Sequence, residues 1–305
     1  MKKQCYFLLG ILVAFSSLFV SCDENEDDLD PTICKITVTC TEGGKVKISK
    51  YLETSENVPI GSEIEVVATP DEGYEFTGWY VGDSAEEPIG TEPIFTFIAT
   101  KNTTLTAHFT KRTYKAVDLG LPSGIKWAAH NVGATKPEEY GGYYAWGEIE
   151  EKEYYSWSTY KWCNGSYDTM TKYCTGIYYG TIDNKTVLDP EDDVAHVKWG
   201  GSWRMPTKAE QDELRNNCTW TWTTQNGVKG YKVTSKTNGN SIFLPAAGRR
   251  YSAGLGLSGS VGYCWSSSLD GDFSGSAYSL CFYGGSYDWG SDERCYGFSV
   301  RPVSK

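Results

Sequence analysis

Cysteine and histidine are the residue types in this 305-residue sequence that could bind a metal or act as a nucleophile. Ten cysteines are present, but none forms a Cys-x-x-Cys pair and the three histidines are far apart, so the spacing predicts no metal site. Cys264, Cys281 and Cys295 are too widely separated to act as a closely spaced reactive pair. The sequence shows neither a Ser/His/Asp order nor paired carboxylates. We therefore expect a non-catalytic protein that uses no metal and no cofactor.

Four other cysteines raise the question of disulfide pairing. Cys34 and Cys40 lie an even number of residues apart on one predicted strand, so they share a face but are too far apart to bridge each other. Cys163 and Cys174 flank a loop rich in glycine and tyrosine and could form a disulfide. The sequence leaves the connectivity open.

The first 21 residues have the features of an export signal. Residues 1–3 include two lysines, and residues 6–20 are apolar but form a run too short to span a bilayer comfortably. The apolar run ends at Ser21-Cys22. This arrangement resembles a lipoprotein signal peptide, in which the cysteine, here Cys22, receives a lipid and becomes the new N-terminus. An ordinary secretory signal followed by an incidental Cys22 is the alternative.

An acidic run follows the lipidation candidate at residues 23–28. It resembles the surface-export signal of Bacteroidetes lipoproteins. That resemblance implies a lipid-anchored protein of the outer membrane that faces the cell exterior. Because the segment is strongly charged and nearly free of apolar side chains, we expect residues 22–33 to form a flexible tether.

The composition indicates a β-rich protein and excludes one class of partner. The formal net charge is −11 and the isoelectric point is near 4.9, whereas binding to nucleic acid requires a basic surface. The sequence holds 22 Tyr, 11 Trp and 11 Phe beside 33 Gly, which is typical of short strands and many turns. We expect an α+β fold in which strands dominate.

A first domain is predicted at residues 34–111, where apolar residues alternate and Gly-rich turns separate the strands. The segments GYEFTGWY at residues 73–80 and TTLTAHF at residues 103–109 resemble the divergent internalin B-repeat family. Members of that family are small β-grasp-like modules, common in bacterial surface proteins, that extend a partner domain from the surface. We therefore expect a spacer.

Three aromatic residues of the first domain have two interpretations. Tyr74, Phe76 and Trp79 are expected to supply the core, because so small a domain has few other large apolar residues. A carbohydrate-binding platform made by the same rings is the alternative.

A second domain is predicted at residues 113–305, on the strength of seven short motifs in a fixed order. They are VDLGL at 117–121, IKWAAHNVG at 125–133, GYYAWGE at 142–148, GSWRMPT at 201–207, FLPAAGR at 243–249, WSSS at 265–268 and GFSVRPV at 297–303. The ordered set resembles the Fibrobacter succinogenes major paralogous domain. That family is similar to the formylglycine-generating-enzyme variety of the C-type-lectin-like fold, which implies such a fold here.

Local signals in the second domain predict its framework. Thr207 and Glu210 form a capping box for a short helix, with Leu214 and Cys218 on its inward face. Arginine side chains at two motif positions are expected to hold loops through paired hydrogen bonds. These are Arg204 and Arg301. Four tryptophans are expected to be packing anchors rather than ligand contacts. These are Trp127, Trp146, Trp203 and Trp265.

The C-terminal stretch from Leu269 to Tyr296 is dominated by Gly, Ser, Asp and Tyr. Within it, alternation places Tyr278, Leu280 and Phe282 on one face, suited to a core, and Ser279, Cys281 and Tyr283 on the other. The second face is small, polar and aromatic, like an antibody paratope.

The position and composition of residues 263–298 resemble the variable region of target proteins of diversity-generating retroelements. In those systems AAC codons become NNC, and between Leu269 and Tyr296 only Trp289 and Glu293 cannot be encoded by NNC. A fixed loop-and-strand segment is the alternative.

We expect the stretch to bind a ligand through eight residues. These are Ser279, Cys281, Tyr283, Tyr287, Asp288, Asp292, Cys295 and Tyr296. The predicted function is that of a surface receptor or adhesin for an external protein or glycan. The alternatives are a structural component of a surface or pilus-like assembly and, less favoured, an oxidase of the formylglycine-generating type.

Overall fold

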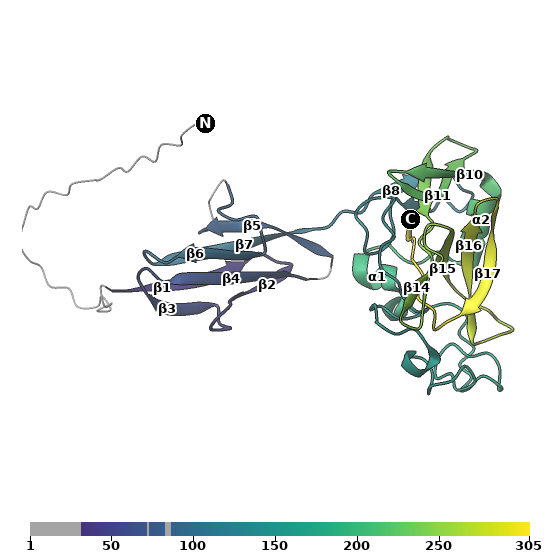
Figure 1. Ribbon diagram of the computed structural model, residues 1–305, viewed down its shortest axis with the longest axis horizontal. Coiled ribbons are helices and arrows are strands. Elements are labelled where there is room, and N and C mark those ends of the chain that lie inside the picture. The colour runs from purple at the N-terminus through teal and green to yellow at the C-terminus, as the bar shows by residue number, and fades with distance from the viewer. Residues whose placement is uncertain (1–31, 72, 83–86) are drawn as a thin grey trace, which may run out of the picture.

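The computed structural model describes residues 32–71, 73–82 and 87–305, and the chain forms two β-rich parts joined near residue 112 (Figure 1). The signal segment, Cys22 and all but the last two residues of the predicted tether lie outside the described residues. In the described chain, no helix is long and apolar enough to cross a membrane.

The described residues of the first part form seven strands in two sheets. The strands are β1 (Ile33–Cys40), β2 (Gly44–Ile48), β3 (Ser55–Pro59), β4 (Glu63–Pro70), β5 (Tyr74–Val81), β6 (Ile94–Ile98) and β7 (Thr103–Lys111). One sheet has the order β3-β1-β7-β5 and the other β2-β4-β6. The first and last strands, β1 and β7, pair in parallel at the centre of the larger sheet, and the other pairings are antiparallel.

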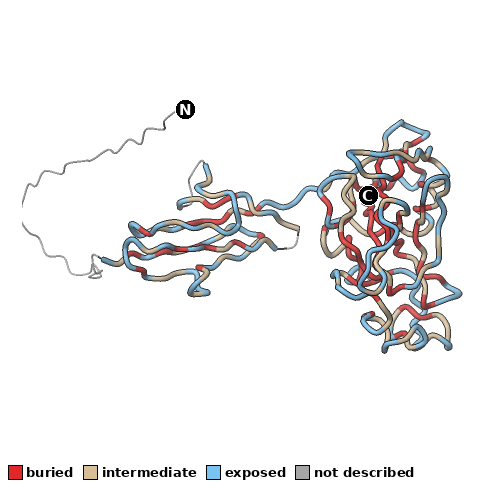
Figure 2. Tube along the Cα trace, viewed as in Figure 1, coloured by how far each residue is buried: buried red, intermediate tan, exposed pale blue. Residues whose placement is uncertain are grey.

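Side chains between these two sheets form the core of the first part, seen as buried stretches along the strands in Figure 2. The predicted alternation is confirmed, since Ile36 and Val38 of β1 are buried with every second residue of β4. Trp79 is completely buried, and Tyr74 and Phe76 pack partly buried against the same core. The three aromatic residues therefore belong to the core, as the first of their two interpretations predicted.

The second part contains short strands, two α-helices and long loops. Its strands are β8 (Ala116–Asp118), β9 (Lys126–Ala128), β10 (Cys218–Gln225), β11 (Val228–Ser235), β12 (Ser241–Pro245), β13 (Arg249–Tyr251), β14 (Gly254–Gly256), β15 (Val261–Leu269), β16 (Ser276–Tyr283), β17 (Ser286–Glu293) and β18 (Val303–Ser304). Its helices are the 3₁₀ turns η1 (Trp157–Thr159) and η2 (Pro190–Asp192), followed by α1 (Val194–Trp199) and α2 (Lys208–Asn217).

Four small sheets are formed, with the orders β10-β11-β12, β13-β14, β15-β16-β17 and β18-β9-β8. The predicted β-rich α+β class is confirmed.

Helix α2 begins where the local sequence signals predicted. Thr207 accepts a hydrogen bond from the backbone N–H of Glu210, and the Glu210 side chain accepts one from the backbone N–H of Thr207. Leu214 is buried on the helix, as predicted, whereas Cys218 is buried but lies past the end of the helix, as the first residue of β10. Among the four predicted packing anchors, Trp127, Trp146 and Trp265 are completely buried, whereas Trp203 is half-buried.

Two arginines hold loops together as predicted. Arg204 forms a paired interaction with the Glu210 carboxylate. Arg301 is completely buried, and its Nε donates to Asn131 Oδ1 at 2.8 Å while Nη2 donates to the Phe243 carbonyl at 2.9 Å. Its Nη1 donates to the carbonyls of Ala128 and Ala129. Burial lowers the pKa of Arg301 to about 10, so the guanidinium stays charged at neutral pH.

Disulfide bonds are absent from the described chain, whose eight cysteines are all free. The Cys163 thiol donates to the Trp157 carbonyl and the Cys174 thiol to the Gly176 carbonyl, so the pairing considered for these two cysteines is not formed. Cys34 and Cys40 lie on the same strand, as expected, and are not bridged.

Replacing Arg301 should unfold the second part first. We expect Arg301→Leu to lower the free energy of unfolding by about 3 kcal/mol or more, because four buried acceptors lose a charged donor at once. Denaturant titration measures the loss. Arg112→Leu, which removes an exposed arginine, is the matched control and should change stability little. Equal stability of the Arg301 and Arg112 variants would contradict the framework role of Arg301.

Candidate ligand-binding face

The predicted binding residues lie on or next to the sheet β15-β16-β17, in which β17 is an edge strand. Residues opposite each other in an antiparallel pair point to the same face, so the register defines the two faces of this sheet. Phe282 pairs with Tyr287 and Leu280 with Trp289 on the face that packs against α2 and β10–β12.

Cys281 lies opposite Tyr263 on one side and Asp288 on the other, and it therefore belongs to the second face. That face is open at one end of the sheet and covered at the other. At the covered end, Trp265 and Ala277 are buried in a hydrophobic cluster of the second part. At the other end, Tyr283 is 50% exposed. The alternation predicted for β16 is thus confirmed, but only part of the polar face reaches solvent.

Three of the eight predicted residues are not displayed on this face, and the prediction is wrong for them. Ser279 is completely buried, and its hydroxyl donates to Asp292 Oδ2 at 2.6 Å. Cys295 is buried in a second aromatic core cluster, just past the end of β17. Tyr287 lies on the opposite face and stacks on Trp220, with ring centroids 4.6 Å apart.

Asp288 is exposed, but its carboxylate forms an ion pair with Arg215. Arg215 belongs to helix α2, which packs against the opposite face of the sheet. Its role in the structure is to join β17 to α2. Four predicted residues remain on the face, namely Cys281, Tyr283, Asp292 and Tyr296.

Three residues that sequence reasoning missed complete the surface. Arg249 of β13 lies over the ring of Tyr263 at 5.6 Å and over the ring of Tyr296 at 5.1 Å. Tyr251, which is 57% exposed, packs edge-on against Tyr296 with ring centroids 5.4 Å apart. We call the combined surface the open face. It consists of Arg249, Tyr251, Tyr263, Cys281, Tyr283, Asp292 and Tyr296.

A sequence signal existed for two of the missed residues. Tyr263 stands at the start of the stretch considered variable, and its even spacing from Trp265 puts both on one strand face. Arg249 closes the motif FLPAAGR, which was interpreted only as framework. No local pattern places Arg249 beside Tyr296, because that contact joins two distant segments.

The ionisable groups of the open face favour binding over covalent chemistry. Burial, and secondarily the Asp292 carboxylate, raises the pKa of the Cys281 thiol to about 11. The thiolate, which is the nucleophilic form, is therefore scarce at neutral pH. Burial also raises the pKa values of Tyr263 and Tyr296 to about 12. The face accordingly presents neutral hydroxyls and aromatic rings beside the guanidinium of Arg249.

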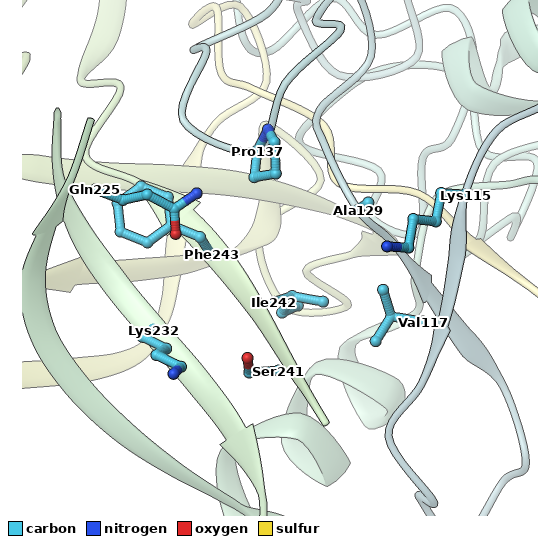
Figure 3. A pocket seen from close by; sticks show the side chains of 9 residues that line it. All are labelled: Lys115, Val117, Ala129, Pro137, Gln225, Lys232, Ser241, Ile242 and Phe243. Atoms are coloured by element: carbon cyan, nitrogen blue, oxygen red, sulfur yellow. The ribbon is translucent and has the colours of Figure 1, made fainter. Parts of the chain in front are cut away.

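A small cavity of about 140 Å³ lies away from this face, between β8, β9 and the sheet β10-β11-β12 (Figure 3). Val117, Ile242 and Phe243 contribute its apolar walls, and Lys115 and Lys232 contribute amines. None of the predicted binding residues lines it. In the described chain, no group of three or more His, Cys, Asp or Glu side chains is placed to hold a metal ion.

Comparison with known proteins concerns the first part of the chain. Residues 34–113 match the divergent InlB B-repeat domain family. This match confirms the resemblance seen in the first part and indicates a role in a surface protein. No curated protein and no solved structure matches the chain. The relationship of the second part to the major paralogous domain and to C-type lectins therefore remains a prediction.

Replacing Asp292 should show how much the burial of its carboxylate destabilises the folded protein. Burial raises the pKa of Asp292, although Ser279 and Arg249 oppose the rise, so its ionised form is disfavoured in the folded state. We expect Asp292→Asn to raise the free energy of unfolding at pH 7. As pH falls through the raised pKa, the wild-type folded state takes up a proton before the unfolded chain, so the advantage should shrink.

Denaturant titration at pH 7 and at acidic pH measures this difference, with the exposed Asp272→Asn variant as the control. An Asp292→Asn protein that is less stable at pH 7 would show that the carboxylate stabilises the fold, in contradiction to the desolvation argument.

Proposed function

We propose that the protein is a surface lipoprotein that binds an external ligand through the open face. The observation that carries the proposal is that side chains from β13, β15, β16, β17 and the following loop meet on one aromatic surface, on which Tyr251 and Tyr283 are exposed. Tyrosine supplies rigid contact area at low entropic cost, and arginine beside it is the other residue type enriched in binding hot spots. The B-repeat module between the N-terminus and this surface supports the role of a spacer.

The C-type-lectin-like identity of the second domain belongs to the same proposal. It is supported by the ordered motifs, whose residues build the framework: Trp265 and Arg301 are completely buried, and Trp146 donates to the Ser266 carbonyl at 2.8 Å. A frame fixed by buried motif residues leaves the residues of the open face free to differ without unfolding the domain.

The proposal also includes diversification of the open face by a retroelement. Tyr263, Cys281, Tyr283, Asp292 and Tyr296 are all residues that NNC codons encode, and all lie between residues 263 and 298. We expect their codons to end in C and a near-copy carrying AAC codons to lie close to a reverse-transcriptase gene. Sequencing the coding region and its surroundings tests this, and codons ending in T at these positions would exclude it.

Lipidation at Cys22 should anchor the protein in the outer membrane. We expect Cys22→Ala to abolish incorporation of labelled fatty acid and to move the protein from the outer-membrane fraction to a soluble one. Cys5→Ala, which changes a cysteine within the predicted signal, is the matched control and should change neither result. Protease treatment of intact cells then reports which side of the membrane the protein faces. Continued membrane fractionation of the Cys22 variant would rule out the lipid anchor.

Ligand binding should depend on the tyrosines of the open face. The experiment screens the labelled full-length protein against arrays of glycans and of extracellular proteins, and then measures affinity for each ligand that binds. We expect Tyr263→Ala and Tyr283→Ala each to weaken binding about tenfold or more, as loss of a hot-spot aromatic does. The control is Tyr178→Ala, which removes a tyrosine that is 83% exposed on a loop outside the face. Unchanged affinity of both face variants would place the binding site elsewhere.

A further inference from the structure

A second concave site lies on the second part of the chain and shares no residue with the open face. It is a pocket of about 350 Å³ where the turn between β15 and β16 meets the long loop that follows β9. We call it the aromatic pocket. It is lined by Trp157, Tyr167, Tyr179, Phe273, Gly275, Ser276 and Glu293.

Aromatic rings make up most of its wall, and two of them are unusually exposed. Tyr167 is 54% exposed and Phe273 is 58% exposed, although both are large side chains that folding normally covers. Clustered exposed aromatic residues mark binding sites more often than chance surface positions. The two walls lie close together at Gly275. A Cβ atom added to this glycine would lie 3.5 Å from Tyr167 Cβ and 3.8 Å from the Trp157 ring.

The walls are held in place from behind by Arg294, which is completely buried. Its Nη1 donates to the Ser274 carbonyl at 2.8 Å and to the Tyr173 carbonyl at 3.0 Å. The Ser274 hydroxyl in turn accepts a hydrogen bond from the backbone N–H of Thr175 at 3.0 Å. The turn that carries Phe273 and the loop that carries Tyr167 and Tyr179 are therefore tied together, which makes a preformed pocket.

One carboxylate faces this pocket without a cationic partner. Glu293 is exposed at the end of β17, on the strand face opposite to Asp292. Among the described residues it belongs to none of the ion pairs. Its carboxylate contacts the Cys295 thiol, which lies 3.7 Å from Oε2, and the Tyr296 hydroxyl, neither of which carries a positive charge. A negative charge without a cationic partner beside aromatic rings favours a ligand that carries a positive group.

We propose that the aromatic pocket binds a methylated ammonium group, such as the quaternary head of choline. A cation over aromatic faces is attracted by the ring quadrupoles, and a nearby carboxylate adds a direct charge interaction. A quaternary ammonium has no N–H donors to satisfy, which suits a site whose polar groups are few. The chain's net charge of −11 also favours a cationic ligand.

The test compares choline with 3,3-dimethylbutanol, its uncharged analogue of the same shape, in ligand-observed NMR titrations of the full-length protein. We expect choline to bind about tenfold or more tightly than the analogue. Glu293→Gln should weaken choline binding about tenfold, and Phe273→Ala should weaken it as well. Asp168→Asn and Tyr178→Ala, which change exposed residues of the neighbouring loop outside the pocket lining, are the matched controls and should have no effect.

Several outcomes would overturn the proposal: no choline binding, equal affinity for the uncharged analogue, or an unaffected Glu293→Gln protein. Binding of a neutral saccharide such as methyl glucoside in place of choline would also overturn it and make the pocket a sugar site. Glu293→Gln keeps the size and shape of the side chain, so the test holds even where Phe273→Ala disturbs folding. The tyrosines of the open face do not line this pocket, although Tyr296 contacts Glu293 from outside it, so Phe273→Ala, which leaves that contact in place, tests the pocket separately.

Discussion

Burial of two charged arginines is the constraint on which the second part of the chain depends. Long stretches of this part lie outside regular strands and helices, so much of the backbone must find hydrogen-bond partners outside regular elements. Arg301 donates to carbonyls at the end of β9 and within β12, and Arg294 donates to carbonyls of the loop after β9 and of the turn before β16. A buried guanidinium is tolerated only when its donors are satisfied, so each arginine requires that arrangement of loops.

This constraint separates the residues that define the fold from those that define the surface. Arg301 and the buried tryptophans Trp127, Trp146 and Trp265 stand in the short ordered motifs, whereas much of the open face draws on positions between the motifs, such as Tyr263 and Cys281. The sheet β15-β16-β17 connects the two sets, because one of its faces packs on helix α2 and the other emerges from the core only at one end. A surface built in this way can change its side chains while the framework stays the same.

Features set by neighbouring residues could be predicted from the sequence. The capping box of α2, the alternation along β1 and β4, and the aromatic core of the first part follow from local spacing and needed no knowledge of distant contacts. The failures have a common physical cause. Ser279 is polar and alternates with core residues, but it is completely buried and bonded to Asp292 of the neighbouring strand. Tyr287 is an even number of residues from Tyr283, which within one strand would put both on the same face. The Gly284-Gly285 hairpin instead pairs Tyr287 with Phe282, so Tyr287 lies on the face opposite to Tyr283.

The parallel pairing of β1 and β7 has a mechanical consequence. The chain enters the first part at the start of β1 and leaves it at the end of β7, whose continuation reaches Tyr114, stacked on Trp199 with ring centroids 3.8 Å apart. A force that pulls these two ends apart slides the neighbouring strands along each other. The evenly spaced hydrogen bonds between Ile36 and Cys40 on one strand and Thr103 and Ala107 on the other are then loaded together rather than one at a time. Shear of this kind resists extension better than unzipping, so the module can carry tension between its two ends.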